Sequence, residues 1–147
     1  MFADNHPGQV GLRLGYDGTL AHGIEAGADM FLVPSVYESC GLNQLYSLRY
    51  GTPPIVNPTR DLADTVVKAD EYLTTEGIGT GFWLAAPTGD ALVAAIHRAT
   101  HLWHSPTQWR HLKRNGMQQK FSWDISATRC LAPYKDLAAH RLPGVPT

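Results

Sequence analysis

The sequence is poor in the features that mark several classes of protein. It has only two cysteines, Cys40 and Cys130, which lie far apart and make no disulfide framework, so both are expected to be thiols. Its formal net charge is −1 and it has no basic block, which argues against nucleic-acid binding. No apolar run approaches a membrane span, and residues 1–7 lack the regions of a signal peptide. We therefore expect a cytoplasmic protein with no nucleic-acid or membrane partner, in which any anionic ligand is held by local groups.

The sequence does contain enough apolar residues for one core. With 147 residues and 44% hydrophobic content, the chain is long enough for one ordinary domain and too short for two. Residues 142–147 contain two prolines and a glycine and lack an apolar period. We therefore expect one lobe over residues 1–141 and a tail over residues 142–147.

Short apolar runs alternate with helical patterns along the chain. The predicted strands cover residues 10–14, 30–33, 52–56 and 82–84. The predicted helices cover residues 19–26, 42–50, 62–67, 88 to about 105, 107 to about 120 and 124 to about 139. Pro133 is expected to kink or break the last helix near Leu131. The order of strands and helices predicts a three-layer α/β fold around a parallel sheet with right-handed crossovers, followed by C-terminal helices.

A polar segment, residues 34–46, joins the predicted strand 30–33 to the predicted helix 42–50. In a parallel α/β sheet such a loop lies at the carboxyl edge of the strands, where ligands bind, and a glycine at a helix start lets backbone N–H groups face an anion. Glu38 and Cys40 would then be presented at a phosphate site. The alternative interpretations are a solvated loop carboxylate for Glu38 and a small buried apolar side chain for Cys40.

Several segments resemble the C-terminal lobe of bacterial glycogen synthase and plant starch synthase. The most specific is Glu38-x-Cys-Gly-Leu-Asn-Gln-Leu-Tyr46. The resemblance covers nearly the whole chain, and its other segments are Gly15-Tyr16-Asp17, Ala28 to Ser35, Arg49 to Thr52, Leu62 to Val66, Thr80-Gly81-Phe82, Trp109, Gly116-Met117, Phe121-Ser122-Trp123 and Tyr134. It implies a Rossmann-like lobe of a retaining, two-lobed GT-B glycosyltransferase.

The resemblance also implies a reaction and a set of site residues. The family transfers glucose from a sugar nucleotide, usually ADP-glucose in bacteria, to the 4-hydroxyl of an α-1,4-glucan, without an obligatory metal or other cofactor. Carried over position by position, Glu38 would be the catalytic carboxylate beside the donor glucose. The implied substrate-binding residues are Tyr16, stacked on the adenine, Cys40 beside Glu38, Gly41, Leu42 and Asn43 at the diphosphate, and Gln44 in the same block. Tyr16 has a second interpretation as a core aromatic.

The sequence departs from the family pattern at some positions. Thr59-Arg60-Asp61-Leu62 stands where the family has Thr-Gly-Gly-Leu, Ser39 replaces a proline and Val36 an arginine. The family's basic pair that clamps the diphosphate, and its acceptor lobe, correspond to segments outside this sequence, so we expect a sheet truncated at its N-terminal edge and a lobe that is inactive alone. The alternatives are a non-catalytic remnant or binding module, or a half-enzyme complemented by a separate chain. The residues do not choose between ADP-glucose and UDP-glucose.

Two other groups of residues have functional and structural interpretations. His97, His101 and His104 share one helix face, but no cysteine or carboxylate at ligand spacing completes a zinc site, which favours surface histidines. Aromatic residues near the C-terminus could stack on sugars, but their helical spacing favours packing between helices. These are Trp103, Trp109, Phe121 and Trp123.

Overall fold

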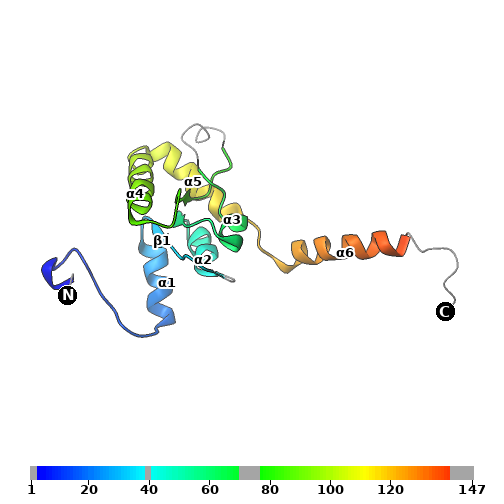
Figure 1. Cartoon of the computed structure of the whole chain (residues 1–147), viewed down its shortest axis with the longest axis horizontal. Helices are drawn as coiled ribbons and strands as arrows, with labels where there is room; N and C mark the ends of the chain where they lie inside the picture. The colour runs from blue at the N-terminus through cyan, green and yellow to red at the C-terminus, as the bar shows by residue number, and fades with distance from the viewer. Residues whose placement is uncertain (1–2, 39–40, 70–76, 140–147) are drawn as a thin grey trace.

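The computed structural model describes residues 3–38, 41–69 and 77–139, so the predictions for Ser39, Cys40 and the tail lie outside the described residues. A small α/β body is flanked by an extended N-terminal segment and a projecting C-terminal helix (Figure 1). The elements are η1 (Ala3–Asn5), α1 (Gly18–Gly27), β1 (Phe31–Val33), α2 (Asn43–Tyr50), β2 (Pro54–Val56), α3 (Arg60–Thr65), β3 (Phe82–Trp83), α4 (Gly89–Trp103), α5 (Pro106–Gln118) and α6 (Trp123–Ala139).

The centre of the body is a parallel sheet of three strands in the order β1-β2-β3. Val33 is aligned with Val56, and Ile55 with Phe82. Because successive side chains of a strand point to opposite faces, Ile55 and Val56 enter two different cores. The central strand β2 is therefore buried on both faces, as expected for a parallel sheet, whereas Leu32 of the edge strand β1 is 45% exposed.

Helices cover both faces of this sheet. On one face, Ile55 and Phe82 pack with Ala99 of α4 and Trp109 of α5. On the other face, Val33 and Val56 pack with Leu48 of α2, Leu62 of α3 and Val66. The predicted three-layer α/β architecture is therefore confirmed for the body.

Local sequence signals set the ends of the helices. The N–H of Leu20 donates to the Asp17 carboxylate at 3.0 Å and caps α1, and the N–H of Ala91 donates to the Thr88 hydroxyl at 3.3 Å and caps α4. Gly51 ends α2 with a left-handed φ of 74° that glycine adopts without strain. These caps explain why the predicted helix bounds agree closely with the observed ones.

The predicted strand 10–14 is wrong. Residues 10–14 lie outside the sheet, with Leu12 57% and Leu14 76% exposed. Figure 1 shows this blue segment running away from the body before it enters α1. A strand requires a neighbour for its backbone hydrogen bonds and a core for one of its faces, and this segment has neither. Since no strand pairs with its outer side in the described residues, β1 is an edge strand of the sheet.

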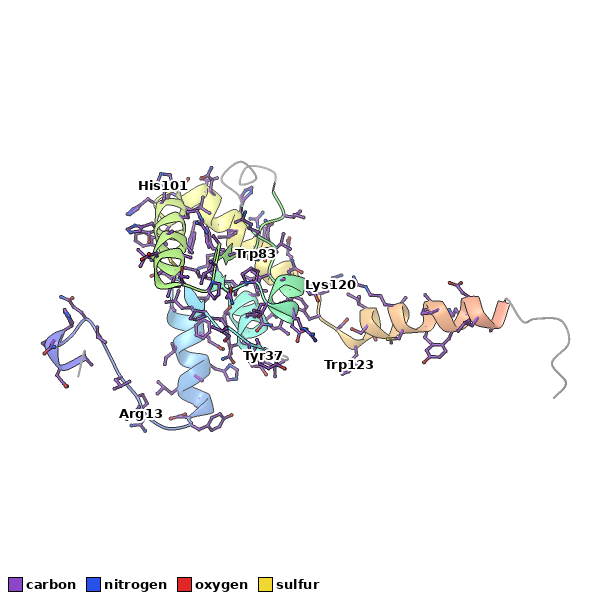
Figure 2. All side chains as sticks on the ribbon, viewed as in Figure 1. Arg13, Tyr37, Trp83, His101, Lys120 and Trp123 are labelled. Atoms are coloured by element: carbon purple, nitrogen blue, oxygen red, sulfur yellow. The ribbon has the colours of Figure 1, made fainter. Side chains whose placement is uncertain are left out.

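The C-terminal helix differs from expectation in two ways. It runs through Pro133 as one helix, so the predicted break is wrong. The carbonyl of Arg129, which loses its partner to the proline, is on an exposed helix and water can satisfy it. Packing is confirmed for Trp109, which is buried and stacks on Phe82 at 6.4 Å, but not for Trp123, which is 87% exposed. Figure 2 shows Trp123 at the start of α6, away from the body.

Candidate functional site

The loops that follow β1 and β2 meet at the carboxyl edge of the sheet. The strands are aligned at Val33 and Val56, so both end at the same level. The side chain of Asn57 donates to the Ser35 carbonyl at 3.0 Å, and its backbone N–H donates to the Val33 carbonyl at 3.4 Å. These bonds fix one loop against the other and give the edge at which parallel α/β sheets bind ligands a defined shape.

Glu38 and Gly41 of the loop after β1 and Gln44 of α2 form one packed group. Glu38 is half-buried, and Figure 2 labels its neighbour Tyr37, which is exposed beside α2. A Cβ placed on Gly41 would lie 2.5 Å from Oε1 of Gln44 and 3.1 Å from Cγ of Glu38. Gly41 therefore occupies a gap between these two side chains that no other residue fits without a shift.

Gln44 lies beneath this loop, in the first turn of α2. Its side chain is buried, and Nε2 donates to the Gly41 carbonyl at 2.6 Å. Nε2 also lies 3.4 Å from the Thr65 hydroxyl oxygen, a longer contact. Oε1 is buried and has no hydrogen-bond partner in the described part of the chain. The amide thus holds the loop by one strong bond and leaves one acceptor unused.

The N-terminus of α2 carries no side-chain cap. Leu42, the residue that precedes the helix, has an apolar side chain, and its carbonyl accepts from the Tyr46 N–H at 3.0 Å. Leu42 and Asn43 are both exposed. The first N–H groups of a helix have no intrahelical partner, so this end of α2 can accept an anion on uncapped backbone donors.

The departure from the family pattern at Arg60 and Asp61 lies at the start of α3, directly after the loop that follows β2. Arg60 is exposed and has a φ of 21°, a positive value that strains a residue with a side chain. The hydroxyl of Thr65 donates to the Asp61 carbonyl at 2.6 Å, and Thr59 Oγ1 is buried without a partner in the described residues. Glycine would take the Arg60 conformation more easily.

Tyr16 is separate from this group. It is 100% exposed, directly before the Asp17 cap of α1, so the core interpretation of Tyr16 is wrong. Among the described residues no hydrogen bond or ring contact joins Tyr16 to the loop after β1. Its stacking role stays a prediction, as do the roles of Glu38, Gly41, Leu42, Asn43 and Gln44.

One polar cluster was not anticipated from sequence. Glu25 is buried in α1, with Oε2 3.3 Å from Nδ1 of His22. The His22 ring packs edge-on against Tyr46 at 4.9 Å, and the Thr52 hydroxyl donates to the Glu25 carbonyl at 2.6 Å. The i, i+3 spacing of His22 and Glu25 was the available signal. The cluster joins α1 to α2.

His97 and His101 of α4, and His104 directly after this helix, do not form a metal centre. His97, His101 and His104 are exposed, and in ranges 3–38, 41–69 and 77–139 no three His, Cys, Asp or Glu side chains are placed to hold a metal ion. Figure 2 shows His101 on the outer end of α4, away from the loop after β1. The free thiol of Cys130 is exposed on α6. None of the described helices is long and apolar enough to cross a membrane.

Comparison with known proteins gives a family and a set of relatives. Residues 15–116 match the family of glycosyl transferases group 1. The chain is 52% identical over 139 residues to a glycogen synthase of Halorhodospira halophila, covering 95% of this chain and 28% of that protein. It is 50% identical over 134 residues to a glycogen synthase of Alkalilimnicola ehrlichii, covering 91% of this chain and 27% of that one. The chain therefore spans little more than a quarter of the length of these relatives.

Two solved structures match the chain at lower sequence identity. The catalytic domain of starch synthase IV from Arabidopsis thaliana, bound to ADP and acarbose, matches with a TM-score of 0.70 and 32% identity over 84% of this chain and 25% of that one. A sucrose-phosphate synthase from Thermosynechococcus elongatus matches with a TM-score of 0.53 and 29% identity, over 78% of this chain and 27% of that one. Both matches support the α/β architecture described above.

Proposed function

The chain belongs to the group 1 glycosyltransferases, whose family model matches residues 15–116, and from this membership we propose that it is the sugar-nucleotide-binding part of a glycogen or starch synthase. The proposed donor is ADP-glucose and the proposed acceptor is the 4-hydroxyl of an α-1,4-glucan, with retention at the anomeric carbon. The presence of ADP in the related starch synthase IV supports a nucleotide ligand. The proposed lobe comprises residues 1–141.

One observation carries the proposal: the half-buried Glu38 lies just before the uncapped N-terminus of α2, at the carboxyl edge of the sheet. Transfer breaks the bond between the anomeric carbon and a diphosphate oxygen, so negative charge develops on the departing diphosphate. Oriented N–H groups at the start of α2 would stabilise that charge. This arrangement of donors suits a diphosphate better than a neutral ligand.

Glu38 has a separate role in the proposed reaction. Positive character develops at the anomeric carbon as the donor bond breaks, and a nearby carboxylate stabilises it or orients the sugar hydroxyls. A retaining enzyme with a covalent intermediate needs a nucleophile and a second carboxyl group about 5 Å away. Glu38 is the one carboxylate that the family motif supplies in this loop, so we propose attack by the glucan hydroxyl on the same face that the diphosphate leaves.

The chain alone is proposed to bind the donor without transferring glucose. A glucan acceptor has to be held at the face of the sugar from which the diphosphate leaves, and the proposed partner for this is an N-terminal lobe, in the same protein or from a separate chain. A non-catalytic binding module is the second candidate. This candidate is favoured by Arg60, which stands where the family pattern has a glycine. Its charged side chain and positive φ lie beside the proposed donor site.

Calorimetric titration of the purified chain tests the proposal. We expect ADP and ADP-glucose to bind in the millimolar range or tighter, and UDP and UDP-glucose to bind more weakly. Absence of binding of all four nucleotides at millimolar concentration would overturn the assignment of this chain as the nucleotide lobe. A glucan-extension assay should give no turnover with the chain alone, and clear turnover would show that the proposed inactivity is wrong.

A further inference from the structure

Gly41 is required in its loop for space and not for backbone conformation. Its φ lies outside the left-handed range that favours glycine, in contrast to Gly51 with a φ of 74°. What excludes a side chain at Gly41 is the approach of Gln44 Oε1 and Glu38 Cγ, at 2.5 Å and 3.1 Å from the Cβ position. The loop backbone is thus the point of contact between the carboxamide of Gln44 and the side chain of Glu38.

The buried amide of Gln44 is unfavourable for the stability of the fold. Its side chain is only 1% exposed, and its Oε1 lacks a hydrogen-bond partner among the described residues. A buried polar atom without a partner destabilises the folded state, and an apolar side chain of the same length would avoid that cost. The amide does, however, donate the 2.6 Å hydrogen bond from Nε2 to the Gly41 carbonyl, which an apolar side chain could not make.

The same amide connects the loop after β1 to α3. Nε2 lies 3.4 Å from the hydroxyl oxygen of Thr65, and this hydroxyl donates to the carbonyl of Asp61 at 2.6 Å. A continuous path of polar contacts therefore runs from Gly41, beside Glu38, to the first turn of α3, which begins at Arg60. A change in Gln44 should therefore affect both the loop after β1 and the first turn of α3, although the donor itself need not touch the buried amide.

We propose that Gln44 is a positioning residue: through the Gly41 backbone it fixes the Glu38 carboxylate and the N–H groups at the start of α2 in the geometry that receives the donor. This inference rests on the proposed function. It assigns to Gln44 a role beneath the site in place of the direct substrate contact that the family motif implied. Because Glu38 faces the glucose and the α2 N-terminus faces the diphosphate, loss of the amide should weaken ADP-glucose binding more than ADP binding.

The test compares Gln44→Met with Gln118→Met in the full 147-residue chain. Methionine keeps the length and burial of Gln44 and removes the bond to Gly41, whereas Gln118 is exposed at the end of α5 and lies outside the site. The readout is the ratio of the dissociation constants for ADP-glucose and ADP, measured by calorimetry well below the unfolding temperature. A purely structural role would lower the unfolding temperature and leave this ratio unchanged.

We expect the preference for ADP-glucose over ADP to fall by about fivefold in Gln44→Met, the effect of losing one ordinary hydrogen bond. Gln118→Met should retain the wild-type preference. An unchanged ratio in Gln44→Met, with wild-type binding intact, overturns the inference alone. Failure of the wild-type chain to bind either nucleotide overturns the proposed function, and the inference falls with it, so the two failures are distinguishable.

A double-mutant cycle separates action through Gly41 from direct contact with the donor. Gly41→Ala should reduce the same preference, because its Cβ displaces Gln44 and Glu38. If Gln44 acts through Gly41, the double variant Gly41→Ala/Gln44→Met should bind no more weakly than the weaker of the single variants Gly41→Ala and Gln44→Met. Additive losses would show that Gln44 contacts the donor itself and would overturn the positioning role.

Discussion

The side chain of Asn57 donates a 3.0 Å hydrogen bond to the backbone carbonyl of Ser35, and this bond joins the ends of two adjacent strands at the candidate site. Asn57 is buried directly after β2, whereas Ser35 lies in the loop after β1. The bond spans two loops that are distant in sequence. The relative position of these loops is therefore fixed by the fold itself and does not require a bound ligand.

Replacing Asn57 with alanine should therefore destabilise the body. The substitution removes a buried donor and leaves the Ser35 carbonyl without this partner, so we expect the free energy of unfolding to fall by about 1–3 kcal/mol. Urea denaturation followed by circular dichroism measures the change. Asn5→Ala in η1, which is exposed, is the matched control and should be neutral. Equal stability of the two variants would contradict the structural role of the Asn57 bond.

Glu38→Gln should change ligand preference and not stability. Glu38 is half-buried and is proposed to face the glucose, so its neutral isostere should lower the affinity for ADP-glucose by about tenfold, the scale of a charge-assisted hydrogen bond, and leave ADP affinity nearly unchanged. Calorimetric titration with each nucleotide measures both values. Asp124→Asn, on the exposed start of α6, serves as the control. Equal losses for ADP and ADP-glucose would place Glu38 at the diphosphate instead.

Arg60→Gly should stabilise the chain. The φ of 21° at Arg60 strains a residue with a Cβ, and glycine removes that strain at some entropic cost, for an expected net gain of about 1 kcal/mol. Arg110→Gly within α5 makes the same chemical change in an ordinary helix and should destabilise by about 1 kcal/mol. Urea denaturation should thus give opposite signs for the two variants. Destabilisation by both would show that the Arg60 backbone carries no strain.

The two tryptophans Trp109 and Trp123 should differ strongly in their contribution to stability. Trp109→Ala leaves a cavity beside Phe82 in the core and should cost about 3–5 kcal/mol. Trp123→Ala removes a side chain that is largely in solvent and should change stability by less than about 0.5 kcal/mol. Denaturation followed by far-ultraviolet circular dichroism avoids dependence on tryptophan fluorescence. Comparable losses would mean that Trp123 packs in solution.

Local signals in the sequence were sufficient to predict most helices. Asp17 and Thr88 cap their own helices, and Gly51 ends α2, so each boundary is encoded within a few residues of where it occurs. The segment from Val10 to Leu14 has an equally clear alternation but forms no strand. Strand formation depends on a partner elsewhere in the fold, which alternation within a segment does not supply.

The candidate site was predictable in position but not in its internal contacts. Placing Glu38 and Gly41 at the carboxyl edge follows from the order of one strand and one helix. The burial of Gln44 beneath Gly41, and its connection to Thr65, depend on how α2 packs against α3, which no spacing within the motif reveals. The Asn57 bond to Ser35 is non-local for the same reason. The exposure of Tyr16 likewise depends on the neighbours of the extended N-terminal segment.

Because α6 projects from the body, its local stability against unfolding should be lower than that of the sheet and α4. All described side chains of this helix except Ile125 are exposed, and Figure 1 shows the helix extending beyond the body. A solitary helix of this length is only marginally favoured over coil in water, whereas the strands and α4 are held by a shared core. Amide protons of α6 should therefore exchange with solvent without unfolding of the sheet, and cleavage within α6 should leave the carboxyl edge of the sheet in place.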